Sequence, residues 1–151
     1  MARAQDMLSI TGACGPAKAK FSTRIDATPQ PTGRDPQRAL VYFFLETTDP
    51  HYYRFATVRV GLDGQWAGAY RESSWIAVPV SAGEHKVCAL ADGVPVPEIM
   101  DLNVEPGKTY FLRTREITTA DEKYLMLDQM SQEQWKYVLT RYPATVATLK
   151  P

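Results

Sequence analysis

Hydrophobic and polar residues alternate along residues 58–90, and this alternation predicts consecutive β-strands that fold back on one another. Val58, Val60 and Leu62 occupy every second position, so the strand they form has one buried and one solvent-facing side. Asp63-Gly64 follows directly, and such a pair between two strand-like segments is typical of a type I′ turn. We therefore expect a hairpin and two further strands, at residues 58–62, 65–70, 75–80 and 82–90.

More strand-like segments lie on both sides of this region. Residues 40–45 are apolar at positions that face both sides of a strand, which is typical of a central strand. Residues 21–25 predict a short edge strand, and the prolines and glycine of residues 27–37 predict a linker or a strap over the surface. Two later strands are expected at residues 109–117 and 124–127.

One helix is predicted near the end of the chain. Ser131 and Gln134 have the spacing of a capping box, and Pro143 ends the helix. Four residues at helical spacing form an apolar stripe that should pack on the sheet. The stripe consists of Trp135, Val138, Leu139 and Tyr142.

These elements predict an all-β fold, an immunoglobulin-like β-sandwich of about seven to nine strands with one short C-terminal helix. At 151 residues the chain has the length of one domain. We expect residues 1–37 to form an N-terminal tail and Pro-rich strap, and residues 38–151 to form the sandwich and its helix.

Charge argues against two classes of partner. The 17 Lys and Arg residues balance the 17 Asp and Glu residues, whereas a nucleic-acid-binding protein normally carries a basic excess or stripe. The sequence also has no run of about 18 apolar residues, so no transmembrane segment is expected.

The N-terminus and the two cysteines indicate in which cellular compartment the protein is expected. Ala2-Arg3-Ala4 has the form of a signal-peptidase site without an apolar segment before it, which fits a trimmed export signal or an Ala-rich start alike. Cys14 and Cys88 are either a disulfide or two buried thiols, and we favour the disulfide, which forms in oxidising compartments. Lipidation of Cys14 is not expected, because Thr11 stands where a lipoprotein signal has leucine.

Four segments carry a recurring plan of strands and turns: residues 38–44, 60–68, 83–89 and 106–113. Their order and spacing resemble a bacterial domain-of-unknown-function family of predicted envelope lipoproteins, the type called domain of unknown function 2846. The chain departs from the family plan at Gln65, where lysine is commoner, and in lacking a clear lipoprotein signal. The resemblance implies an immunoglobulin-like or transthyretin-like sandwich that is exported, envelope-associated and not an enzyme, and it transfers no catalytic residue.

The candidate catalytic residues are not accompanied by the sequence motifs of known catalytic sites. A triad of Ser73 or Ser74 with His51 and Asp49 can be composed, but no Gly-x-Ser-x-Gly segment supports it. His85 is predicted to be a strand residue, and the acidic residues lie mainly at turns. We therefore expect no catalytic, cofactor-binding or metal-binding residue and no cofactor.

Aromatic residues cluster around the first hairpin, where exposed rings on a rigid sheet can stack on sugars or anchor a protein. Large aromatic residues usually fill the core instead, and for Trp66 the two interpretations are equally supported. The candidate binding surface consists of His51, Tyr52, Tyr53, Asp63, Trp66 and Tyr70.

The sequence therefore predicts a non-catalytic binding or structural domain of the bacterial cell envelope. We expect it in the periplasm or outside the cell, with its signal peptide removed from this chain, and with an envelope protein or a glycan as partner. One alternative is a carbohydrate-binding module, and the other is a small hydrolase that uses His51.

Overall fold

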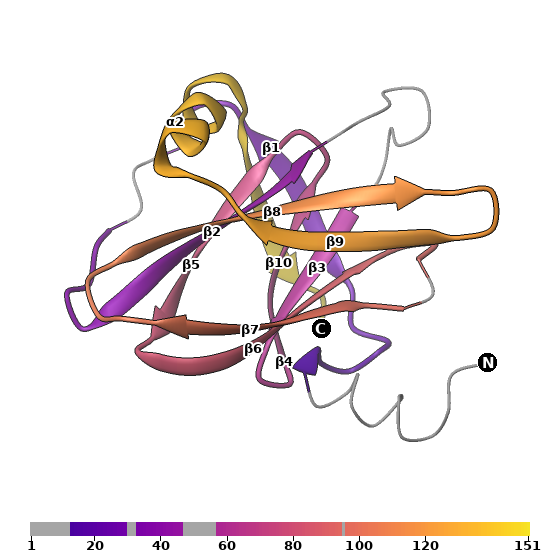
Figure 1. The fold of residues 1–151 in the computed structure, drawn as a ribbon, viewed down its shortest axis with the longest axis horizontal. Coiled ribbons are helices and arrows are strands. Elements are labelled where there is room, and N and C mark those ends of the chain that lie inside the picture. The colour runs from indigo at the N-terminus through magenta and orange to yellow at the C-terminus, as the bar shows by residue number, and fades with distance from the viewer. Residues whose placement is uncertain (1–12, 30–32, 47–56, 95) are drawn as a thin grey trace.

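The computed structural model describes residues 13–29, 33–46, 57–94 and 96–151, which form two β-sheets and one helix, α2 (Gln132–Arg141) (Figure 1). The first five strands are β1 (Phe21–Asp26), β2 (Arg38–Glu46), β3 (Thr57–Leu62), β4 (Gln65–Arg71) and β5 (Trp75–Ser81). The remaining strands are β6 (Gly83–Ala91), β7 (Glu98–Val104), β8 (Thr109–Thr118), β9 (Lys123–Gln129) and β10 (Ala144–Leu149).

The strands divide into a sheet of six and a sheet of four. The larger sheet has the order β1-β10-β5-β2-β8-β9, and the smaller sheet has the order β4-β3-β6-β7. Strand β2 pairs in parallel with β8, and β10 pairs in parallel with β5, whereas the other neighbours are antiparallel. The predicted all-β sandwich with one short helix is confirmed, with ten described strands rather than seven to nine.

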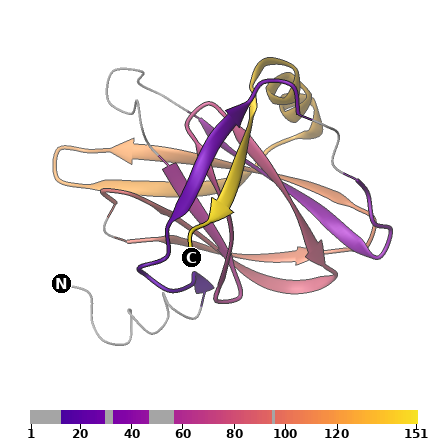
Figure 2. The same ribbon diagram turned by 180° about the vertical axis from the view of Figure 1, so that it is seen from behind.

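One of the additional strands is β10, which follows the helix and was not predicted. Its six residues pair antiparallel with β1, from Ala144 opposite Asp26 to Leu149 opposite Phe21. Figure 2 shows these two strands side by side. The predicted edge strand near residue 21 is therefore confirmed, and the sandwich includes residues that precede Arg38.

The predicted hairpin forms between β3 and β4. Asp63 and Gly64 both have positive φ, 52° and 91°, as a type I′ turn requires. Val58 and Val60 are fully buried between the sheets, in agreement with the alternation of the sequence. The register shifts between Val60 and Gly61, where the pairing with β4 is irregular.

Strand β2 lies between β5 and β8 and is covered on both sides, as its apolar sequence predicted. Val41, Phe43 and Leu45 enter the core between the two sheets. Tyr42 and Phe44 point the other way and join a second, aromatic cluster beneath α2. Strand β2 thus contributes side chains to both hydrophobic clusters, one on each face of the six-stranded sheet.

Helix α2 begins with the predicted capping box. The Ser131 hydroxyl accepts a hydrogen bond from the backbone N–H of Gln134 at 3.2 Å, and the Gln134 side-chain oxygen accepts one from the N–H of Ser131 at 3.1 Å. Trp135 and Val138 are buried against the six-stranded sheet. Leu139 is 37% exposed, so the predicted stripe is wrong at this residue and the buried face is narrower than expected.

Candidate functional site

The predicted binding surface around the first hairpin is not assembled as expected. Tyr70 is completely buried, because it lies opposite Val58 on the face of the hairpin that enters the core. Its hydroxyl hydrogen-bonds with that of Thr114, and burial raises its pKa far above the usual 10.0. The prediction that Tyr70 belongs to a binding surface is therefore wrong.

Trp66 is half-buried beneath the N-terminal segment. Its indole Nε1 donates a hydrogen bond to the carbonyl of Pro16 at 2.8 Å. The Arg59 guanidinium lies 4.6 Å from the ring centre, within the range of a cation–π contact. Trp66 therefore contacts the N-terminal segment of its own chain.

The other aromatic members of the predicted surface, His51, Tyr52 and Tyr53, lie outside the described residues.

A disulfide anchors the same N-terminal segment to the outer face of the four-stranded sheet. The structure joins Cys14 to Cys88, with their Cα atoms 5.1 Å apart, and this bears out the pairing favoured from the sequence. Both cysteines are almost completely buried. Gly61 makes this close approach possible, because a Cβ at that position would lie 2.3 Å from the Cys14 carbonyl oxygen. Arg59 adds a hydrogen bond to the carbonyl of Ala19 at 2.7 Å.

Asp63 joins the hairpin turn to β6 through two side-chain contacts. One carboxylate oxygen accepts the backbone N–H of Lys86 at 2.8 Å, and the other lies 2.6 Å from Nδ1 of His85. The second ring nitrogen of His85, Nε2, lies 2.6 Å from the carbonyl oxygen of Ser81. Both ring nitrogens therefore lie close to acceptor oxygens, which favours the protonated imidazolium, in which both nitrogens donate.

The protonation of this pair follows from its surroundings. Burial lowers the pKa of His85, but the hydrogen bonds to Asp63 and Ser81 outweigh it and raise the pKa from its usual 6.5. The backbone N–H of Lys86 has the largest effect on the pKa of Asp63 and lowers it from its usual 3.8. Burial acts in the opposite direction, and the His85 imidazole lowers the pKa further. Asp63 and His85 therefore form a structural ion pair that ties the turn to β5 and β6.

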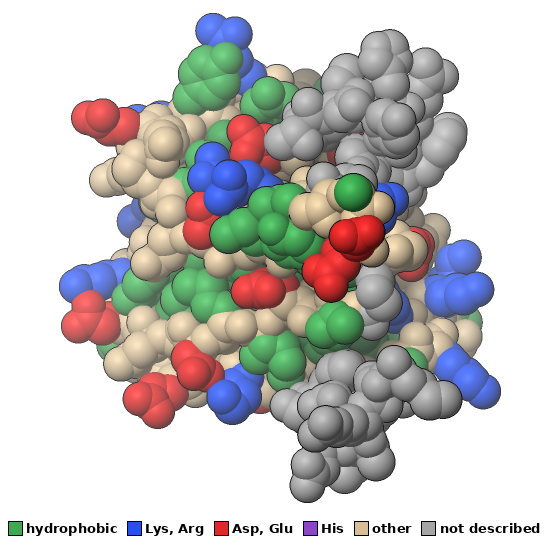
Figure 3. Space-filling view, turned by 45° about the vertical axis from the view of Figure 1, so that its right-hand side comes forward, with side chains coloured by type: hydrophobic (Ala, Val, Ile, Leu, Met, Phe, Trp, Pro, Cys, Tyr) green, Lys and Arg blue, Asp and Glu red, His purple; other side chains and the backbone are tan. Residues whose placement is uncertain are grey.

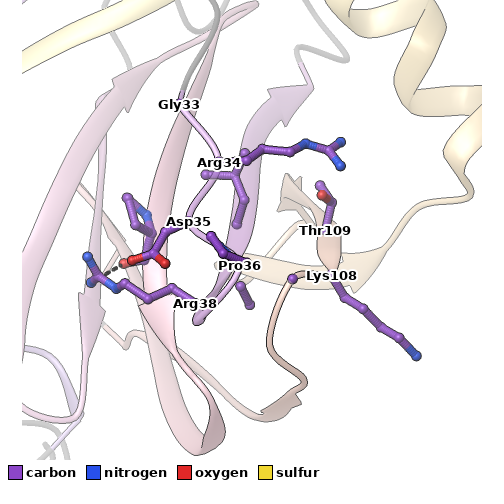
Figure 4. Close-up of a pocket in the computed structure, with 11 residues that line it drawn as sticks. Gly33, Arg34, Asp35, Pro36, Arg38, Lys108 and Thr109 are labelled. Carbon is purple, nitrogen blue, oxygen red and sulfur yellow. Dashed lines mark hydrogen bonds between the residues drawn. The ribbon is translucent and has the colours of Figure 1, made fainter.

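A basic cleft lies where residues 33–40 pass the β7–β8 turn. Arg34, Arg38 and Lys108 line it, but their charged ends point in different directions (Figure 4). The Arg38 guanidinium donates a hydrogen bond to the carbonyl of Pro79 at 3.0 Å. The three cations therefore do not converge on one position where an anion could sit.

A second hollow, with several apolar residues in its lining, lies between α2 and the six-stranded sheet, and we call it the α2 groove. Its volume is about 470 Å³, within the range of ligand sites. Phe44 of β2 lines it together with Met130, Val138 and Tyr142. The ring centres of Phe44 and Tyr142 are 5.0 Å apart, and Tyr137, which is 52% exposed, adds a third ring.

Charged residues form the rim of the α2 groove. Arg113 of β8 donates to both carboxylate oxygens of Asp128, at 3.3 and 2.9 Å, and lies 3.4 Å from the carboxylate of Glu46. Glu133, in the first turn of α2, adds another carboxylate. Sequence reasoning missed this site, and its only local signal is Tyr137, an aromatic residue beside the predicted apolar stripe.

The exposed surface shows no large area of one charge in the view of Figure 3, where basic and acidic side chains alternate around central hydrophobic ones. Within the described ranges, no three His, Cys, Asp or Glu side chains form a group that could hold a metal ion. No helix in the described part of the chain is long and apolar enough to cross a membrane.

Comparison of the chain with protein-family models, with curated proteins and with solved structures found no match.

Proposed function

We propose that this protein is an exported, non-catalytic binding or structural domain of the bacterial cell envelope. The observation that carries the proposal is the buried Cys14–Cys88 disulfide, which joins the N-terminal segment to the sandwich. Disulfides form and persist in oxidising compartments such as the periplasm and the cell exterior. The resemblance of residues 38–127 to envelope lipoproteins supports the same compartment.

The two alternatives have less support. A carbohydrate-binding module would use exposed aromatic rings, but Tyr70 is buried and Trp66 contacts Pro16 and Arg59. The hydrolase hypothesis rests on His51 and Asp49, both outside the described residues. A binding role remains supported by the α2 groove, which combines an apolar floor with a charged rim.

The proposal is tested by counting free thiols in protein that was exported and never reduced. The denatured protein is alkylated and its intact mass is measured, with a chemically reduced sample as the control for complete alkylation. We expect no alkylated cysteine in the first sample and two in the second. Two free thiols in exported protein would contradict the proposal, because they would remove the main observation that supports an envelope location.

A further inference from the structure

We propose that the α2 groove binds a lysine or arginine side chain, with its hydrophobic neighbours, on a segment of a partner protein. This inference rests on the proposed binding function and deepens it, because it states the chemistry of the partner. Three features of the groove support it: the balance of charge at its rim, its aromatic walls and its apolar floor.

The rim has more negative than positive charge. Two carboxylates, those of Glu46 and Glu133, and one guanidinium, that of Arg113, line the groove. The Arg113 guanidinium already contacts Glu46, and it also contacts Asp128, which lies outside the lining. No described cation lies within ion-pair distance of Glu133, so its carboxylate is available to an incoming cation.

The aromatic walls favour a cation of the same kind. Phe44, Tyr137 and Tyr142 line the groove, and the faces of aromatic rings attract ammonium and guanidinium groups. Tyr137 already makes one such contact, with the Arg141 guanidinium 4.3 Å from its ring centre. A second cation at the groove side of these rings would lie near Glu133, which is one turn of α2 away from Tyr137.

The apolar floor explains why a long side chain is required. Met130 and Val138 offer no hydrogen-bonding group, so a bare ammonium ion would lose hydration there without compensation. The aliphatic stem of lysine or arginine can cover such a surface while its charged end stays at the polar rim. At about 470 Å³ the groove also has room for adjacent hydrophobic residues of the same segment.

The test uses two capped peptides with free side chains, Gly-Leu-Lys-Leu-Gly and its matched counterpart Gly-Leu-Glu-Leu-Gly. Each is titrated into the full chain, and backbone amide shifts are followed by NMR. We expect the lysine peptide to shift the amides of Phe44, Val138 and Tyr142, and to bind at least about fivefold more tightly than the glutamate peptide.

Two pairs of variants locate the contact. Glu133→Gln and Tyr137→Ala should each weaken binding of the lysine peptide about twofold to fivefold, as expected for an ion pair or cation–π contact at an exposed site. The matched controls Glu84→Gln and Tyr124→Ala change exposed residues outside the groove and should leave the affinity unchanged.

Equal binding of the two peptides, no shift at millimolar peptide, or equal losses in the control variants would overturn the groove proposal. Such a result would not affect the proposed export, because the thiol count measures the disulfide and not peptide binding. Conversely, free thiols together with specific lysine-peptide binding would reject the envelope assignment and leave the groove as a binding site in another compartment.

Discussion

At the scale of single residues, His85 and Asp63 show how a turn sequence acquires a tertiary contact. The positive φ of Asp63 is set locally by the type I′ turn. The same side chain then accepts hydrogen bonds from His85 and from the backbone of Lys86, more than twenty positions later in the chain. The ion pair should therefore make the fold sensitive to pH.

The pKa of His85 should fall when Asp63 is replaced by asparagine, which keeps the turn conformation but removes the charge. Because the folded pKa of His85 is raised, its stabilisation is complete below about 6.5 and is lost as the pH rises through the folded pKa. Because the pKa of Asp63 is lowered, its contribution is present above about 3.8 and is lost in stronger acid.

NMR titration of the His85 imidazole in the wild type and in Asp63→Asn measures this effect. Denaturant unfolding should show the largest difference between the two proteins at about pH 5, between the two usual pKa values. Since the Asp63 side chain is half exposed, that difference should be about 1 kcal/mol or less. An unchanged His85 pKa in the variant would show that the ion pair does not form in solution.

At the scale of elements, α2 is positioned by both its cap and its aromatic face. Ser131 is the N-cap residue of the helix, and Trp135, in the first turns, packs in a cluster with Phe44 and Phe111. The ring centres of Trp135 and Phe111 are 5.2 Å apart. Loss of the cap should therefore affect the stability of the domain as well as that of the helix.

Ser131→Ala should lower the free energy of unfolding by about 1 kcal/mol, because it leaves the N–H of Gln134 without its side-chain acceptor. The matched control is Gln132→Ala, one residue further on at an exposed position, with an expected change within about 0.5 kcal/mol. Denaturant unfolding followed by tryptophan fluorescence measures both variants. Equal effects of the two substitutions would contradict the role of the cap.

At the scale of the whole molecule, the disulfide closes a loop that includes much of the sandwich. Cys14 and Cys88 are 74 positions apart, so the bond restricts the unfolded chain strongly. The segment that it anchors also receives hydrogen bonds from Arg59 and Trp66. Removal of the bond should consequently destabilise the protein more than any single contact of this segment.

Replacement of both cysteines by alanine should lower the free energy of unfolding by about 4 kcal/mol, the chain-entropy value for a loop of this length. Thermal unfolding with and without a reductant measures the effect. The reductant should destabilise the wild type and leave the double variant unchanged, since the variant has no bond to reduce. A wild type that is insensitive to full reduction would show that the bond contributes little to stability.

Local signals predicted many of the elements, because turn chemistry, side-chain alternation and helix capping act between near neighbours. Asp63-Gly64 indicated the hairpin, the two-sided apolar sequence of β2 indicated a central strand, and Ser131 with Gln134 indicated the start of α2. Leu139 shows the limit of such signals, since helical spacing alone does not say how far a neighbouring sheet reaches around the helix.

The sequence by itself thus determined the all-β class, the hairpin turn and the capped helix, which depend on contacts within a few residues. Only the tertiary structure decided that Tyr70 enters the core, that Trp66 contacts the N-terminal segment and that β10 pairs with β1. It also decided where α2 leaves a groove beside Phe44. The physical reason is that these features depend on which distant segments meet, and local periodicity carries no information about that choice.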